Sequence, residues 1–253
     1  MTAIDLKHKM KALKTCVIVP TYNNEGTVTE VVLSVLKCCS DVIVVNDGST
    51  DATASILRQF DGSITVVDYQ HNRGKGYALK SGFRKALAMG FDYAVTIDSD
   101  GQHFASDIEK FVSALETNPG ALVIGSRGLD HDNMPGKNKF ANNFSNFWFR
   151  VQTCRRLSDT QTGFRLYPLH NLHGLSLLTS RYEAELELLV FAAWHAVKIC
   201  EIPIQVYYPP VEERVSHFRP ARDFARISVL NTVLCVVAVI YGLPLKFLKT
   251  LMK

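Results

Sequence analysis

Two aspartates directly follow an apolar run in the segment "AVTIDSDGQHF" (residues 94–104). Asp98 and Asp100 are two residues apart, so in an extended chain both side chains point the same way, and Gln102 continues that line. Two carboxylates and an amide oxygen are hard ligands, suited to Mg²⁺ or Mn²⁺ bound together with the phosphates of a substrate. We therefore expect a divalent-cation site at these three residues. An EF-hand calcium loop does not fit, because its sixth position, counted from Asp98, must be glycine and is His103.

Two earlier apolar runs also end in residues that could contact a ligand. The first ends at "PTYNNEGT" (20–27), where Pro20 shapes a loop and Tyr22 offers a flat ring beside the acid Glu25. A plain strand-to-helix turn is the alternative explanation of this segment. The second ends at "NDGSTDA" (46–52), whose later polar residues are suited to cap the next helix. Capping does not account for Asp47, which is therefore a second candidate for ligand binding.

The segment "HNRGKGYALKSG" (71–82) places Lys75 between two glycines just before a helical pattern. Backbone amides at such a turn could hold a phosphate, or they could form only the turn. A dinucleotide-binding fingerprint requires glycine or alanine at position 79, which is Leu79. A Rossmann dehydrogenase is therefore not expected.

These segments belong to a pattern of short apolar runs that alternate with amphipathic stretches. Strands are predicted at 15–19, 41–45, 63–67, 93–97 and 121–125, and helices at 27–38, 51–60, 76–89 and 106–117. The pattern predicts an α/β fold, with a parallel sheet covered on both faces that binds ligands at the carboxyl ends of its strands. After residue 126 the pattern is irregular, and it ends with a helix near 183–196, a strand near 198–206 and a long apolar helix.

The composition of the chain is that of an ordinary globular protein. Its 253 residues, 47% of them hydrophobic, can bury one full core, with or without an appendage. A net charge of +4 is too small to indicate a nucleic-acid partner. The six cysteines lack CxxC spacing, which is typical of buried thiols in a reducing compartment. The first apolar run is too short for a signal peptide, so we expect the chain to begin in the cytoplasm.

Six segments in order indicate a family. They are "VIVPTYNNEGTV", "VIVVNDGSTD", "NRGKGYALKSG", "DSDGQH", "IGSR" and "DTQTGFRLY", and they cover most of residues 15–220. With them the chain resembles the family 2 glycosyltransferases of the GT-A fold, a Rossmann-like and mostly parallel sheet with flanking helices. It looks most like the dolichyl- or polyprenyl-phosphate glucosyl- and mannosyltransferases, whose "DTQ-GF" and "EVPI" signatures match residues 159–164 and "EIPI" at 201–204.

The resemblance implies a hexosyltransferase of glycolipid biosynthesis that uses a UDP- or GDP-sugar donor and Mg²⁺ or Mn²⁺, and that inverts the anomeric carbon. Carried over by position, the residues that would line the nucleoside pocket are Pro20, Tyr22, Glu25 and Asp47. The residues that would serve the metal and diphosphate are Asp98, Asp100 and Gln102, and Lys75 is placed on the same donor side. The candidates to grip phosphates are Arg127, Arg165 and Arg214.

The acceptor is left open by the sequence. A lipid phosphate is already ionised near neutral pH, because its second pKa is about 6, and it needs no general base. A hydroxyl acceptor would need a carboxylate, for which Asp159 and Glu185 are the candidates. Where the subgroup has "R-x-x-G-x-S-K" this chain has "ERVSHFRPARD" (213–223), which keeps Arg214 but changes the lysine position to His217. A non-catalytic sugar-nucleotide-binding protein is the third alternative, and the complete metal set argues against it.

Residues 227–245 form an uncharged stretch of 19 residues, about 28 Å long as a helix at ~1.5 Å per residue. It could span a membrane, lie in the membrane interface, or pack in a homo-oligomer through its small residues. We expect it to hold the protein at the cytoplasmic face of a membrane, near a membrane lipid acceptor. Arg214 would contact phosphate, while Arg222 and Arg226 would anchor the membrane side. The expected domains are residues 1–220, the glycosyltransferase domain, and 221–253, the membrane-associating helix.

Overall fold

The computed structural model describes residues 2–128, 136–172, 179–208 and 220–251. Within them, seven strands form one sheet in the order β3-β2-β1-β4-β6-β5-β7. The strands are β1 (Thr15–Thr21), β2 (Val42–Asn46), β3 (Thr65–Asp68), β4 (Tyr93–Thr96), β5 (Leu122–Ser126), β6 (Arg165–Pro168) and β7 (Ile199–Pro203). All neighbouring strands are parallel except β6, which is antiparallel to both β4 and β5.

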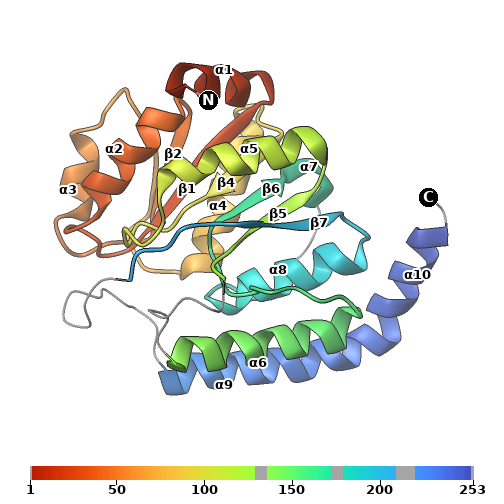
Figure 1. The fold of residues 1–253 in the computed structure, drawn as a ribbon. Helices are drawn as coiled ribbons and strands as arrows, with labels where there is room; N and C mark the ends of the chain where they lie inside the picture. Colours follow the sequence, from red (N-terminus) through yellow and green to blue (C-terminus); the bar gives the residue numbers. More distant parts are fainter. Residues whose placement is uncertain (1, 129–135, 173–178, 209–219, 252–253) are drawn as a thin grey trace.

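Helices cover both faces of this sheet (Figure 1). One face carries α1 (Ala3–Ala12), α2 (Val28–Cys38), α3 (Thr53–Arg58) and α5 (Ile108–Thr117), the last preceded by the short η1 (Ala105–Asp107). The other face carries α4 (Lys75–Ala88) and α8 (Glu183–Trp194). Helices α6 (Gly136–Thr153) and α9 (Pro220–Val237) pack on α8 and on each other. The remaining helices are α7 (Leu169–Leu172), the π-helical turn η3 (Ala238–Gly242) and α10 (Leu243–Leu251).

The strand β1 shows why helices must pack on both faces of the sheet. Cys16 and Ile18 belong to the core cluster on the α4 and α8 side, whereas Val17 and Val19 belong to the cluster on the α2 and α5 side. Successive side chains of a strand point to opposite faces, so a continuous apolar run becomes buried only when both faces are covered. The predicted parallel strands and their two helical layers are confirmed.

Several elements differ from the sequence-based expectation. The strand β6 and the helices α1 and α6 were not predicted, and β6 makes the sheet mixed near its centre. The strand expected near 198–206 ends at Pro203. The apolar C-terminal stretch is helical as predicted, but it changes from α9 to α10 through the π-helical turn η3.

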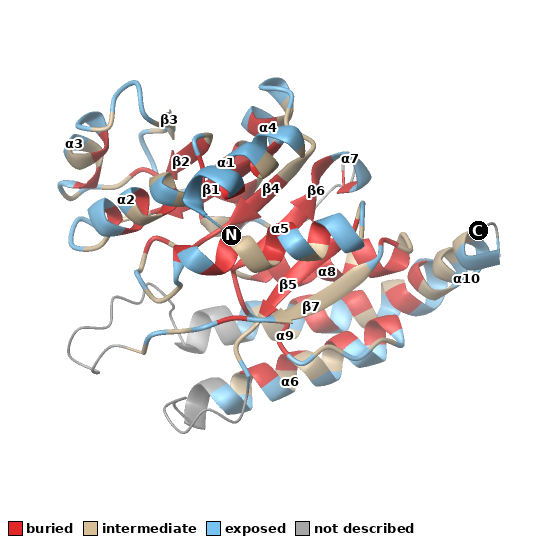
Figure 2. Cartoon of the chain, turned by 45° about the horizontal axis from the view of Figure 1, so that its top comes forward, coloured by how far each residue is buried: buried red, intermediate tan, exposed pale blue. Residues whose placement is uncertain are grey.

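The C-terminal helices pack against the domain along one side. Leu230, Leu234 and Ala238 are buried, whereas many apolar side chains on the opposite side are exposed (Figure 2). A Cβ at Gly242 would overlap the indole ring of Trp194, so only glycine allows this contact. The segment Ala225–Leu251 is long and apolar enough to cross a membrane, by length and composition. The division into domains at residue 220 stays a prediction.

Candidate active site

Several of the predicted site residues lie at the carboxyl ends of three neighbouring strands, β1, β2 and β4. Asp47 comes directly after β2, and Asp98 comes after β4 and one further residue, Ile97. The Ile97 N–H donates to the carbonyl oxygen of Ile18 on β1 at 3.1 Å, which extends the pairing to the edge of the sheet. Since β1, β2 and β4 are parallel, these loops meet at one edge, where ligands of such sheets bind.

Lys75, the first residue of α4, places its ammonium group between two carboxylates. Its Nζ lies 2.7 Å from Asp98 Oδ1 and 3.0 Å from Oε2 of Glu185, in the first turn of α8. Burial alone would lower the pKa of Lys75, but the charges of Asp98 and Glu185 raise it well above its ordinary value. Gly163 leaves room for this group, because a Cβ there would lie 2.5 Å from Asp98 Oδ2 and 2.6 Å from Lys75 Nζ. One lysine thus neutralises acids from two different segments.

Asp100 lies on the turn that follows Asp98 and accepts a hydrogen bond from the Gln102 N–H at 3.0 Å. Burial, together with the neighbouring charge of Asp98, raises the pKa of Asp100 to about 6. A bound cation would relieve this repulsion, so the chemistry of the donor set fits Mg²⁺ or Mn²⁺. Among the residues that the structure describes, no group of three or more His, Cys, Asp or Glu side chains could hold a metal. The two aspartates and the amide would therefore need further ligands from substrate or water.

Arg127 and Asp159 form a bidentate ion pair. Arg127 Nε lies 2.7 Å from Asp159 Oδ2, and Nη2 lies 2.9 Å from Oδ1. The buried Asp159 carboxylate also accepts hydrogen bonds from the N–H groups of Gln161 and Thr162. Burial alone would raise the pKa of Asp159, but the hydrogen bonds and charge of Arg127 lower it overall. Asp159 is therefore a poor proton acceptor in this arrangement.

Arg165, on β6, is 0% exposed. Its Nη1 donates to the carbonyl oxygen of Glu185 at 2.9 Å, and its Nη2 donates to the carbonyl oxygen of Thr160 at 2.8 Å. The guanidinium group is buried in this structure, and the predicted contact of Arg165 with a phosphate stays a prediction. Arg165 connects the Thr160 segment to the first turn of α8, and so positions Glu185.

Asp47 organises the glycine-containing loop before α4. Its Oδ1 accepts from the Arg73 N–H at 2.8 Å, and its Oδ2 accepts from the Gly74 N–H at 2.7 Å and from Asn72 Nδ2 at 3.0 Å. Burial raises the pKa of Asp47, and these bonds offset the rise only in part. Gly74 has a φ of +95°, which glycine adopts readily. The structure thus links the second strand end to the position of Lys75.

Pro20, Tyr22 and Glu25 lie at the end of β1 or in the loop after it. The carbonyl oxygen of Pro20 accepts a hydrogen bond from Ser99 Oγ at 3.1 Å. Tyr22 is partly buried, whereas Glu25 is exposed and its Oε2 accepts from the Ala52 N–H at 2.8 Å. Glu25 therefore holds this loop against the start of α3.

Residues 16–171 match the family described as glycosyl transferase family 2, and this match covers more than half of the chain. This chain belongs to glycosyl transferase family 2. The prediction that it is a family 2 hexosyltransferase is thereby confirmed.

Named relatives of this family 2 chain act on lipid phosphates, according to their names. A UDP-N-acetylglucosamine–dolichyl-phosphate N-acetylglucosaminyltransferase of Methanococcus voltae is 31% identical over 212 residues, which covers 76% of this chain and 84% of the relative. An undecaprenyl-phosphate mannosyltransferase of Micrococcus luteus is 30% identical, with coverages of 76% and 83%. A dolichyl-phosphate beta-glucosyltransferase of Dictyostelium discoideum is 25% identical, with coverages of 88% and 76%.

The fold is similar to that of solved structures. Glucosyl-3-phosphoglycerate synthase of Mycobacterium tuberculosis, in complex with Mn²⁺, UDP and glucosyl-3-phosphoglycerate, superposes with a TM-score of 0.66. The two proteins are 20% identical, and the alignment covers 94% of this chain and 84% of the other. This likeness shows the fold, and the predicted GT-A architecture is confirmed.

Ser99 connects the β1 loop of the glycosyltransferase to the acid turn, a role that sequence alone did not indicate. It is buried, and its Oγ accepts a hydrogen bond from Asn24 Nδ2 at 2.8 Å. The Thr27 Oγ1 donates to the carbonyl oxygen of Ser99 at 2.6 Å. The sequence did contain a signal for this role. In an extended chain Asp98 and Asp100 point to one side, so Ser99 between them must point to the opposite side.

Glu201, on β7, holds the segment that carries Asp159. Its Oε1 accepts from the N–H of Ser158 at 2.8 Å and from the N–H of Asp159 at 3.2 Å. The "EIPI" segment therefore positions the Asp159 loop in this glycosyltransferase. Arg214, by contrast, lies outside the described residues, and its predicted contact with phosphate stays a prediction.

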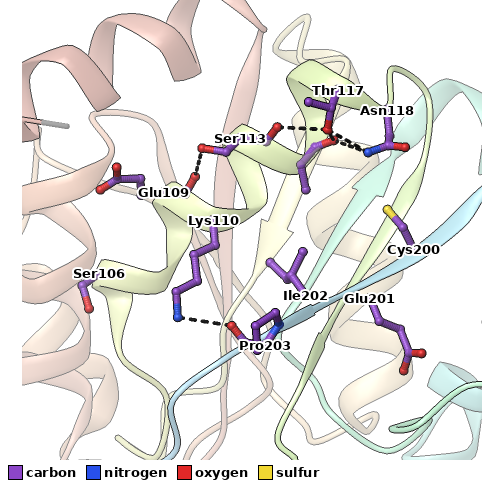
Figure 3. Close-up of a pocket in the computed structure, with 11 residues that line it drawn as sticks. Ser106, Glu109, Lys110, Ser113, Thr117, Asn118, Cys200, Glu201, Ile202 and Pro203 are labelled. Carbon is purple, nitrogen blue, oxygen red and sulfur yellow. Dashed lines mark hydrogen bonds between the residues drawn. The ribbon is translucent and has the colours of Figure 1, made fainter.

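A groove with a cavity volume of about 670 Å³ lies between α5 and β7 (Figure 3). Lys110 lies in it, 2.7 Å from Asp107 and within 3.2 Å of the carbonyl oxygen of Pro203. None of the predicted site residues lines this groove. The candidate active site of the glycosyltransferase is therefore the carboxyl edge of the sheet, not this groove.

Proposed function

We propose that this glycosyltransferase moves a hexose from a UDP- or GDP-sugar to a polyprenyl phosphate, at the cytoplasmic face of a membrane. The observation that carries the proposal is the meeting of Asp98 and Asp100 at the carboxyl edge of the sheet. It is supported by three relatives whose names state dolichyl or undecaprenyl phosphate as the acceptor. Inversion at the anomeric carbon and metal dependence are part of the proposal.

The donor side would be formed by the loops after β1, β2 and β4. Asp98, Asp100 and the amide oxygen of Gln102 would hold Mg²⁺ or Mn²⁺, and Mn²⁺ is present in the solved structure of similar fold. A divalent cation there supplies stabilisation of the negative charge on the departing nucleoside diphosphate. Tyr22 offers a ring for the nucleoside, and Asp47 holds the loop beside it in shape.

Lys75 has a defined part in this arrangement. In the structure its ammonium group neutralises Asp98 and Glu185, which would otherwise be two unpaired anions in a partly buried site. It keeps both carboxylates in place before a substrate binds. Lys75 also lies next to the diphosphate position expected from the two aspartates, so it can contribute positive charge when the diphosphate leaves.

Transfer to a phosphate needs no proton removal. A phosphate oxygen forms the new bond to the anomeric carbon as the bond to the donor diphosphate breaks on the opposite side, which inverts the configuration. The bonding pair leaves with the nucleoside diphosphate, and the attacking oxygen already carries negative charge near neutral pH, since its second pKa is about 6. The low pKa of Asp159 beside Arg127 agrees with a reaction that uses no base there.

Glu185 is the remaining candidate base for a hydroxyl acceptor. Its Oε2 is paired with Lys75, whereas its Oε1 is buried without a hydrogen-bond partner among the described residues. With a phosphate acceptor, Glu185 serves to position Lys75. The two acceptor classes therefore differ in how strongly the reaction depends on the Glu185 carboxylate.

The test is a transfer assay with a panel of UDP- and GDP-sugars, polyprenyl phosphate and Mn²⁺, in which the lipid product is weighed by mass spectrometry. We expect a polyprenyl-phosphate hexose from the wild type, almost none from Asp100→Ala, and none in excess EDTA. Asp159→Asn and Glu185→Gln should keep substantial turnover with a phosphate acceptor.

Three results would contradict parts of the proposal. Full activity in EDTA would refute the metal. Loss of transfer in Glu185→Gln with unchanged donor affinity, and product only on a lipid or glycan hydroxyl, would favour the hydroxyl acceptor. Donor binding without any product across the panel would favour a non-catalytic binding protein.

A further inference from the structure

The helix α6 has an aromatic exposed side and a polar buried side, the reverse of an ordinary surface helix. Phe140 and Phe147 are 67% and 58% exposed, whereas Asn142 and Gln152 are 0% exposed. Phe149 is buried on the inner side as well, so the unusual feature of α6 is the number of rings on its outer side together with the polar residues on its inner side. Exposed phenylalanines of this kind are suited to surroundings that are less polar than water. Its surface position beside α9 is visible in Figures 1 and 2.

The polar side of α6 is used by the candidate active site. Asn146 Oδ1 accepts from the Thr160 N–H at 3.0 Å, and Asn146 Nδ2 donates to the Ser158 carbonyl oxygen at 2.8 Å. Asn142 Nδ2 donates to the same carbonyl oxygen at 3.1 Å. These bonds hold both neighbours of Asp159, so α6 connects its outer face directly to the Arg127–Asp159 pair.

The outer side of α6 carries a cluster of rings. Phe144 lies 6.4 Å from Phe140 and 6.1 Å from Trp148, and Phe147 lies 5.3 Å from Trp148, between ring centroids. We call Phe140, Phe144, Phe147 and Trp148 the aromatic cluster. Tryptophan is enriched at membrane–water interfaces, and tryptophan and phenylalanine commonly form the apolar face of helices that lie in such an interface.

The neighbouring helix α9 continues this apolar surface. It packs on both α6 and α8 through one side, and its other side exposes Val229, Val233 and Val236, followed by Val239 and Ile240 in η3. Because one side of α9 is occupied by the domain, lipid cannot surround this helix as it would a membrane span. A helix of this kind is suited to lie in the plane of the membrane interface.

The charges around this surface indicate which kind of partner it binds. The sequence contains no Asp or Glu in residues 136–153, and a single one, Asp223, in residues 220–253. Lys139 and Arg150 on α6 and Arg226 on α9 are exposed. A second copy of the chain would bring like charges together, whereas an anionic bilayer offers opposite charges and an apolar interior.

We propose that the aromatic cluster of α6 and the exposed apolar side of α9 together dock in the plane of an anionic lipid bilayer. The docked α6 holds the 158–160 segment from its inner side, and so brings the Arg127–Asp159 pair next to the headgroups. The docking needs neither donor nor metal. It rests on the proposed function only for the identity of the acceptor that arrives there.

The test is flotation of the full chain with vesicles of phosphatidylcholine, with and without phosphatidylglycerol. Phe140→Ser/Phe147→Ser should lower the partition coefficient by roughly tenfold or more, because two apolar rings no longer enter the lipid. Val239→Ser/Ile240→Ser should lower it as well. The matched control Ile4→Ser/Leu33→Ser, which changes exposed apolar residues on α1 and α2, should leave it unchanged.

Tryptophan fluorescence gives a second measurement. The chain has two tryptophans, and Trp194 is fully buried in the core. Vesicles of brominated lipid should quench the wild type through Trp148, and they should quench Trp148→Phe much less, because the remaining Trp194 is buried behind η3.

Wild-type affinity in the α6 double variant, or no quenching of Trp148, would overturn the proposal. A dimer in lipid-free sedimentation that is lost in the α6 variant, with vesicle binding unchanged, would identify a second copy as the partner instead. Loss of vesicle binding with UDP binding retained would separate this docking from the donor site. Failure of the transfer assay would leave the vesicle result standing.

Discussion

Replacing Lys75 with methionine tests the central charge arrangement of the site. The change keeps the length of the side chain and removes the positive charge that Asp98 and Glu185 share at 2.7 and 3.0 Å. Breaking a buried ion pair costs about 3–5 kcal/mol, and we take the lower end because the Lys75 and Asp98 side chains are 17% and 24% exposed. A loss of about 3 kcal/mol lowers the melting temperature of a chain of this size by about 6–12 °C.

The assay is thermal unfolding in EDTA and in Mn²⁺. In EDTA we expect the full loss at pH 8 and a smaller loss at pH 5. Burial alone would raise the pKa of Asp98 and the charge of Lys75 lowers it, so without Lys75 this carboxylate can be protonated at pH 5, which relieves the repulsion. Saturation with Mn²⁺ at about 100 times its Kd should restore about 2.7 kcal/mol.

The matched control is Lys14→Met, whose partner Asp92 is 3.6 Å away and whose side chain is 63% exposed. We expect the control to change the melting temperature by less than about 2 °C. A Lys75→Met protein that melts within about 2 °C of the wild type in EDTA would refute the reasoning.

Three further predictions concern the cation, the space that Gly163 leaves for the Lys75–Asp98 pair, and the C-terminal helices. Since the pKa of Asp100 is raised to about 6, protons compete with a metal for this carboxylate below that pH. The Mn²⁺ affinity measured by calorimetry should therefore fall about tenfold per pH unit below pH 6 and stay level above it. Equal affinities at pH 5 and pH 7 would contradict this prediction. Gly163→Ala should displace the ion pair and remove most transfer activity while the far-UV circular dichroism stays unchanged; wild-type turnover would contradict it. Gly242→Ala should lower the free energy of unfolding by about 1–3 kcal/mol, because the added Cβ meets Trp194. The control Gly26→Ala, whose added Cβ would have no atom within 4 Å, should lower it far less. Equal melting temperatures of the two variants would show that the contact is not tight.

The sequence predicted the sheet best where apolar runs were continuous. β1 and β2 are buried on both faces, and their β-branched runs are typical of such strands. β6 was missed because its four residues, RLYP, contain an arginine and a proline and show no alternation. Its place between β4 and β5 comes from long-range antiparallel pairing, which local sequence does not encode.

Helix α6 was missed for a different reason. Periodicity analysis assumes that apolar residues mark the buried side, and in α6 the buried side carries Asn142 and Ser145 besides Phe149, while other phenylalanines are exposed. In α1 only Leu6 and Met10 are buried, which is too few apolar positions for a clear helical pattern.

The candidate site, like the sheet, was predicted only where the information is local in the sequence. The spacing of Asp98 and Asp100 within one segment predicted a shared position for the two carboxylates. The contact of Lys75 with Glu185 depends on how α4 meets α8, and the burial of Arg165 depends on the unpredicted strand β6. Contacts between distant elements were therefore not available from the motifs alone.

The contact between Gly242 and Trp194 has a consequence for how the enzyme selects its acceptor. Trp194 ends α8, and Glu185 lies near the start of the same helix, nine residues or about 14 Å away at ~1.5 Å per residue. In the proposed docking α8 lies against α6 and α9, the two helices that enter the membrane interface, and the Trp194–Gly242 contact fixes how closely α8 approaches them. The height of Glu185 above the membrane is then set by this helix packing. We expect acceptor selection to depend on how far the phosphate rises from the bilayer, and not on the number of isoprene units buried below it.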